Sequence, residues 1–157
     1  MRITAKVDYA VRATAELAAA QAADGGRRAP RKGEAIATAQ AIPLRFLETI
    51  LADLRRAGIV ASQRGAEGGY WLSVPAEEVS VADVIRAVEG PLADVHGQPP
   101  EEVVYAGAAA ELQTVWIATR VALRDVLETT SLASVAGGTL PSAVAELARR
   151  PGSWSRR

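Results

Sequence analysis

Three polar side chains, Arg45, Glu48 and Thr49, have the spacing of neighbours on one face of a helix. Their chemistry suits contacts with the edges of base pairs. An arginine can donate two hydrogen bonds to O6 and N7 of guanine, and a glutamate can accept one from N4 of cytosine. These residues therefore predict a short-chained, polar helix face of the kind that a helix needs to enter the major groove of a DNA duplex.

The helix that would carry this face is predicted to begin at residue 43 or 44, because Pro43 suits the start of a helix. A shorter helix, from about residue 33 to 39, and a turn at residues 40–42 precede it. Together they form a helix-turn-helix pattern, which ordinary core packing of two amphipathic helices can also produce. The second helix has apolar residues at intervals of three and four, as one buried side requires: Leu44, Leu47, Ile50, Leu51 and Leu54.

Two predicted strands, residues 59–63 and 70–74, follow this helix and enclose a glycine-rich tip. Glycines let a backbone approach a phosphate or a groove wall closely, and an arginine such as Arg64 is favoured in a narrow minor groove. Taken alone, the segment also fits an ordinary hairpin with a solvated arginine. Its position directly after the helix pair favours a wing that contacts DNA, with Glu67 directed to solvent.

Three stretches of the chain resemble the Rrf2 family of bacterial transcription regulators: YAVRATAELA (residues 9–18), IPLRFLETILADLRRAGIVASQRGAEGGYWL (42–72) and VSVADVIRAVEGPL (79–92). The resemblance implies a homodimer with an N-terminal winged helix, a long C-terminal dimerisation helix and double-stranded DNA as a partner. It also implies that Arg45 and Glu48 occupy positions at which family members touch bases. The residues expected at the DNA are Pro43, Leu44, Arg45, Glu48, Thr49, Arg56, Arg64, Gly65, Gly68 and Gly69.

Several members of this family hold an iron–sulfur cluster through cysteines, but this chain contains no cysteine. Because thiolates are the normal ligands of such clusters, we expect no iron–sulfur cluster and no other cofactor. The corresponding loop, about residues 90–107, has oxygen ligands and one imidazole that suit a divalent ion. A solvated loop has the same composition, so these residues alone do not predict a metal site: Asp94, His96, Glu101, Glu102 and Tyr105.

We predict a mainly α-helical fold with a small β-hairpin wing, in which a winged helix-turn-helix domain precedes a long C-terminal dimerisation helix. The long helix is expected from about residue 108 to 130. Since it follows a complete domain, its apolar stripe needs another surface, and the matching helix of a second subunit is favoured over its own domain. The predicted divisions are the winged helix domain (1–90), an exit or sensor-type loop (91–107), the dimerisation helix (108–136), and a short helix with a flexible tail (137–157).

The net charge of the chain is zero, but the charge is unevenly distributed. Residues 1–74 contain eleven Lys or Arg and seven Asp or Glu, whereas residues 75–157 contain seven and eleven. A positive N-terminal half attracts a polyanion. Four of its cations, Arg27, Arg28, Arg31 and Lys32, lie just before the helix pair, where they suit either phosphate contacts or a solvated loop.

Catalysis and membrane insertion are disfavoured by the composition. The chain has one histidine and no cysteine, and it has neither a P-loop nor a dinucleotide-binding fingerprint. It also has no run of eighteen apolar residues.

Together with the resemblance, these features predict a cytoplasmic, homodimeric, sequence-specific repressor that reads a palindromic operator with half-sites about 34 Å or a multiple apart. The alternative is a sensor whose DNA binding depends on a small molecule or an ion at the 90–107 loop.

Overall fold

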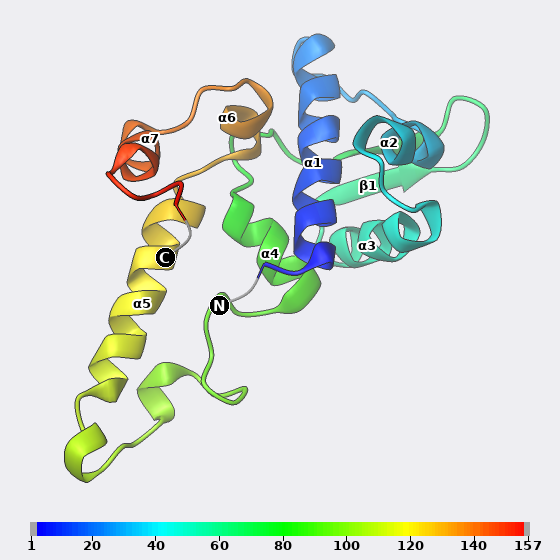
Figure 1. Ribbon diagram of the computed structural model, residues 1–157. Helices are drawn as coiled ribbons and strands as arrows, with labels where there is room; N and C mark the ends of the chain where they lie inside the picture. Colours follow the sequence, from blue (N-terminus) through cyan, green and yellow to red (C-terminus); the bar gives the residue numbers. More distant parts are fainter. Residues whose placement is uncertain (1–2, 156–157) are drawn as a thin grey trace.

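The computed structural model describes residues 3–155 and shows a mostly helical chain with one two-stranded antiparallel hairpin (Figure 1). The order of elements is that of a winged helix-turn-helix domain followed by a long helix, which confirms the predicted fold class. The elements are α1 (Ala5–Ala23), α2 (Gly33–Gln40), α3 (Leu44–Arg56), β1 (Val60–Gln63), β2 (Gly69–Leu72), α4 (Val81–Glu89), the short 3-10 turns η1 (Pro100–Glu102) and η2 (Gly107–Ala109), α5 (Leu112–Leu127), α6 (Leu132–Ala136) and α7 (Ser142–Arg149).

Helix α1 is the centre of the folded domain, and α2, α3, α4 and α6 pack around it. It begins at Ala5, because the Thr4 hydroxyl accepts a hydrogen bond from the Val7 N–H (3.2 Å) and caps the helix. Thr14 is fully buried, but its hydroxyl donates to the Ala10 carbonyl oxygen (2.9 Å). Small side chains on the buried side of α1 let the neighbouring helices approach closely: Ala10, Ala13 and Ala18.

A capping box starts α4 at Ser80. The Ser80 hydroxyl accepts from the Asp83 N–H (3.1 Å), and the Asp83 carboxylate accepts from the Ser80 N–H (3.0 Å). Two of the N–H groups at the helix start, those of Ser80 and Asp83, are thereby satisfied. Partial burial acts to raise the pKa of Asp83, but the hydrogen bonds from Ser80 and the positive charge of Arg86 outweigh it and lower that pKa.

The segment predicted as one dimerisation helix, residues 108–136, is divided in two. Helix α5 ends at Leu127, and α6 restarts after Ser131, whose hydroxyl accepts from the Ser134 N–H (3.1 Å). Leu132 is fully buried, and its N–H donates to the Val79 carbonyl oxygen (2.8 Å). Helix α6 packs on α1 and so lies against the N-terminal domain, although it follows the predicted boundary at residue 90.

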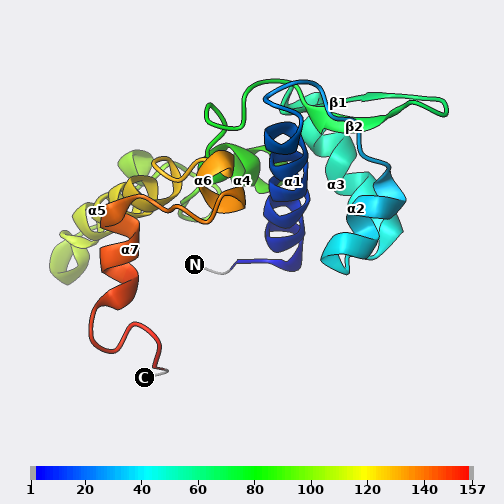
Figure 2. The same ribbon diagram turned by 90° about the horizontal axis from the view of Figure 1, so that it is seen from above.

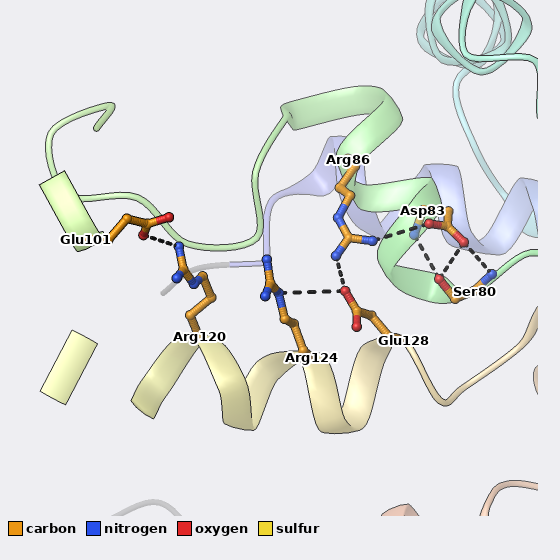
Figure 3. A network of polar contacts seen from close by, with 7 residues as sticks. All are labelled: Ser80, Asp83, Arg86, Glu101, Arg120, Arg124 and Glu128. Carbon is orange, nitrogen blue, oxygen red and sulfur yellow. Dashed lines mark hydrogen bonds and ion pairs between the residues drawn. The ribbon is translucent and has the colours of Figure 1, made fainter. Parts of the chain in front are cut away.

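Helix α5 extends away from the domain (Figures 1 and 2), and a polar network links it to α4 and the loop that follows α4 (Figure 3). Glu128 accepts a hydrogen bond from Arg86 of α4 and lies 3.7 Å from Nε of Arg124. Arg120 pairs with Glu101 at 2.5 Å. Surface ion pairs add little stability individually, so we infer that this network mainly orients α5.

The apolar side of α5 is only partly covered by the rest of residues 3–155. No residue of α5 is buried, and on this side Val115 and Trp116 are 51% and 37% exposed. Apolar side chains grouped on one helix are typical of a surface that packs against another molecule.

Among residues 3–155, no single helix is long and apolar enough to cross a membrane. Helices α2 and α3 meet that criterion only when counted together, across a bend of 115°. The apolar side chains of α3 are buried in the domain core, where α3 contacts α1 and α4.

Candidate nucleic-acid interface

The turn between α2 and α3 sets the direction in which α3 is presented. The bend of 115° between the two helices lies within the usual range for a helix-turn-helix. Ala41 ends α2 in a left-handed conformation (φ 51°). Ile42 is buried, and its N–H donates to the Ala37 carbonyl oxygen (2.9 Å). The predicted turn at residues 40–42 is therefore a tight connection that packs into the core.

The buried side of α3 is as predicted except at its first residue. Leu47, Ile50, Leu51 and Leu54 are fully buried. Leu44 was expected in the same stripe but is 37% exposed, because the first turn of α3 lies at the edge of the core, close to Gly33 at the start of α2.

Phe46 is a large exposed residue on α3 for which the apolar repeat gave no role. It is 45% exposed, and its ring meets the edge of the Tyr9 ring at a centroid distance of 5.6 Å. This contact links the first turn of α3 to α1. The helical spacing excluded Phe46 from the buried stripe but carried no signal for a partner on α1.

The opposite side of α3 has the polar face that the sequence predicted. Arg45, Glu48, Thr49 and Ala52 are exposed, and Pro43 lies exposed just before the helix. The Thr49 hydroxyl donates to the Arg45 carbonyl oxygen (3.3 Å). Within residues 3–155 the side chains of Arg45 and Glu48 make no hydrogen bond or ion pair, so a guanidinium and a carboxylate are free for an external partner.

Arg56 is separated from this group by the length of the helix. It lies eleven residues after Arg45, about 16 Å along the axis, and pairs with Asp53 at 2.9 Å. The Asp53 carboxylate also forms an ion pair with the Lys6 ammonium, at a distance of 2.8 Å between Nζ and Oδ2. The bond from Lys6 is the main cause of a lowered pKa of Asp53, with Arg56 contributing and burial opposing. The structure thus links Arg56 to α1, and does not group it with Arg45, Glu48 and Thr49.

The wing is a short hairpin directly after α3. Its register pairs Val60 with Leu72 and Gln63 with Gly69. Residues 64–67 form the exposed tip, which includes Arg64 and Gly65, and Gly65 has a positive φ of 106°. Two of the predicted DNA-contacting residues are thereby exposed at one end of the hairpin.

Gly68 and Gly69, also expected at the DNA, are buried in the structure. A Cβ atom on Gly68 would lie 2.1 Å from the Gln63 carbonyl oxygen, and one on Gly69 would lie 2.7 Å from the Arg31 carbonyl oxygen. The close approach that these glycines permit is to the protein's own backbone. The exposed part of the wing is residues 64–67, and a DNA contact of Gly68 and Gly69 stays a prediction.

The backbone that crosses Gly69 belongs to the segment between α1 and α2. Arg31 exchanges two backbone hydrogen bonds with Tyr70, each 2.8 Å long, and so adds an extended residue to the free edge of β2. The sequence showed the basic cluster at residues 27–32 but not its place, because pairing of distant segments has no signature in local spacing.

In the loop after α4, the residues considered as metal ligands are mostly engaged elsewhere. Glu101 pairs with Arg120, the Tyr105 hydroxyl accepts from Trp116 Nε1 (3.1 Å), and Asp94 accepts from the Gly97 N–H (2.8 Å). His96 is exposed. Among the described residues, no three His, Cys, Asp or Glu side chains are grouped as a metal site would require.

Comparisons with known proteins agree with this geometry. A profile of the Rrf2 family, described as "Iron-dependent Transcriptional regulator", matches residues 3–138. A protein of Mycobacterium tuberculosis, named provisionally as an HTH-type transcriptional regulator, is 47% identical over 148 residues, which cover 94% of this chain and 89% of that protein. CymR of Bacillus subtilis, an HTH-type transcriptional regulator, is 34% identical over 139 residues, covering 88% of this chain and 92% of CymR.

Two solved structures have a similar fold. CymR, described as the global cysteine regulator of B. subtilis, has a TM-score of 0.72 at 32% identity, covering 88% of this chain and 98% of its own. T. potens IscR has a TM-score of 0.68 at 28% identity and covers 88% of each chain.

Proposed function

This chain belongs to the Rrf2 family of DNA-binding transcriptional regulators, and from that membership we propose that it is a homodimeric repressor of a palindromic operator. The observation that carries the proposal is the outer face of α3. Arg45 and Glu48 are exposed there, next to a wing, and their side chains have no polar partner within residues 3–155. A guanidinium and a carboxylate left free on a helix that can enter the major groove suit base recognition.

On this proposal, α3 lies in the major groove. Arg45 donates to a guanine and Glu48 accepts from a cytosine, and Thr49 lies on the same face, one turn after Arg45. Pro43 and Leu44 then face the sugar-phosphate backbone at the start of the helix. Arg64 and Gly65, at the exposed tip of the wing, reach the flanking minor groove, where the negative potential favours arginine.

The exposed part of the apolar side of α5 supports a homodimer. A helix of 16 residues is about 24 Å long, and pairing it with the same helix of a second copy would bury Val115 and Trp116. A two-fold axis through this contact presents two copies of α3, which requires half-sites about 34 Å or a multiple apart. A dimer on such an operator represses by steric exclusion of the transcription machinery, and it acts by binding rather than by catalysis, in the bacterial cytoplasm.

The iron in the family description does not fit this chain. There is no cysteine to supply thiolates. The oxygen donors of the corresponding loop are engaged with Arg120 and Trp116 or stand apart from one another. We therefore propose that DNA binding requires no iron–sulfur cluster.

DNA binding that depends on a small effector is a second candidate function, because one cavity of the structure favours it. A cavity of about 440 Å³ lies between α4, the loop after it and α5, and is lined by Arg86, Arg120 and Arg124 among others. The Nε of Arg120 is buried there without a partner in the described residues. Asp94 and Glu101 also line the cavity, and Glu101 pairs with Arg120, so a small anionic effector would bind here by taking the place of that carboxylate. Differential scanning fluorimetry with succinate and inorganic phosphate, repeated on Arg120→Gln, tests this candidate. No shift in melting temperature would reject it.

Footprinting of the purified, metal-free protein on the DNA upstream of its own gene tests the main proposal. We expect a protected palindrome with two half-sites about one or two helical turns apart. Protection of a single half-site would contradict the proposed dimer. A requirement for an added metal would contradict the proposal that DNA binding is independent of metal.

A further inference from the structure

The hairpin of the wing carries no net charge. Residues 60–72 include Arg64 and Glu67 as their only charged residues. Phosphate contacts supply much of the affinity of DNA-binding proteins, and they require cations. The hairpin by itself is therefore poorly suited to hold the DNA backbone.

The missing charge lies in the segment that crosses the hairpin, residues 27–32, which we call the basic segment. It has the sequence RRAPRK, with four cations and no acid. Three of them are fixed against the hairpin. The Arg28 guanidinium lies 3.7 Å over the Trp71 ring, and the Lys32 ammonium donates to the Gly65 carbonyl oxygen (2.6 Å). Arg31 is held by its two backbone bonds to Tyr70.

The cations of the basic segment are exposed and are not neutralised by the protein. Arg27, Arg28, Arg31 and Lys32 are all exposed, and none takes part in an ion pair among residues 3–155. In the same half of the chain, Lys6 pairs with an aspartate. The basic segment thus concentrates unpaired positive charge on one side of the wing.

We propose that the basic segment is the phosphate-binding edge of the wing: it supplies the positive charge that the hairpin lacks and binds the DNA backbone beside the minor groove that Arg64 enters. This inference rests on the proposed DNA-binding function and adds a second contact surface to it. Because phosphates carry no sequence information, the basic segment contributes affinity and salt dependence, while α3 contributes base preference.

The double variant Arg27→Gln/Arg31→Gln tests the proposal with little risk to the fold, because neither side chain makes a hydrogen bond or ion pair within residues 3–155. The matched control is Arg149→Gln/Arg150→Gln, which removes the same charge from exposed positions at the end of α7. Fluorescence anisotropy would measure affinity for the footprinted operator and for a scrambled duplex over a series of potassium chloride concentrations.

Each lost phosphate contact lowers the slope of log K against log salt by about 0.9, so the four charges removed from a dimer lower it by up to about 3.6. We expect a decrease of this order in the basic-segment variant, with an unchanged ratio of operator to scrambled affinity, and no decrease in the control. A decrease below about 0.9, or one equal to that of the control, would overturn the inference. If wild-type protein fails to prefer the operator, the proposed function itself fails, which is a separate result.

Discussion

Substitution of Gly69 by alanine should detach the basic segment from the wing. A Cβ atom at this position would lie 2.7 Å from the Arg31 carbonyl oxygen and 2.8 Å from its carbonyl carbon, and φ is +152°, a conformation that alanine rarely adopts. Both neighbours are backbone atoms, so a side-chain rotation cannot relieve the contact. The two Arg31–Tyr70 hydrogen bonds, each 2.8 Å long, must break or stretch.

The expected loss of unfolding free energy for Gly69→Ala is about 3 kcal/mol, from about 1 kcal/mol for each hydrogen bond and about 1 kcal/mol for the strained backbone. Gly25→Ala is the matched control, since Gly25 also has a positive φ (+64°) but an added Cβ meets no atom within 4 Å. Its cost should be about 1 kcal/mol. Urea denaturation measures both values, and hydrogen exchange reports on the Arg31 and Tyr70 amides. If those amides stay protected in Gly69→Ala and its stability equals that of Gly25→Ala, the reasoning is refuted.

Three further predictions concern the domain, its pH dependence and the dimer. Leu132→Ala should lower the unfolding free energy by about 3–5 kcal/mol because the side chain is fully buried, whereas Leu140→Ala, at an exposed site, should cost much less; urea titration compares the two. The lowered pKa of Asp53, caused mainly by Lys6, means that its contribution to stability is complete above about pH 4 and is lost as the pH falls through the folded-state pKa. Asp53→Asn should therefore flatten the acid limb of a pH-stability curve, and an unchanged limb would exclude this role. Val115→Glu should weaken self-association at least tenfold in analytical ultracentrifugation, while an unaltered dimer would remove α5 from the interface.

Local patterns predicted the helix-turn-helix well. The buried stripe of α3 follows from leucine and isoleucine at helical intervals, and the same periodicity predicts a polar outer face. The start of α4 depends on Ser80 and on Asp83 three residues later, which together form its capping box. In both cases the physical cause acts within a few residues of the chain, so the spacing alone carries it.

Contacts between distant segments could not be predicted in this way. Leu132 looks like any other apolar residue of a long helix, and only its packing against α1 shows that it completes the N-terminal domain. Gly69 looks like part of a flexible tip, yet its role is to let Arg31 cross. Leu44 fits the apolar repeat but lies at the edge of the core. These outcomes depend on tertiary neighbours that no local repeat specifies.

The uneven charge of the chain gains a structural explanation. Some of the cations before residue 75 form ion pairs within the domain, as Lys6 does with Asp53. Others, on α3, the wing and the basic segment, have no acidic partner within residues 3–155. A neutral net charge is therefore compatible with one strongly positive surface.

The central claim is that the outer face of α3 reads base pairs, and the base preference of Arg45→Ala tests it most directly. Wild-type and variant proteins would be compared by competitive binding to operators substituted at every position. We predict that the variant loses about 1–3 kcal/mol of binding free energy and its preference for guanine at one symmetry-related pair of positions, while preferences elsewhere are retained. An affinity and a base preference identical to wild type would contradict the claim.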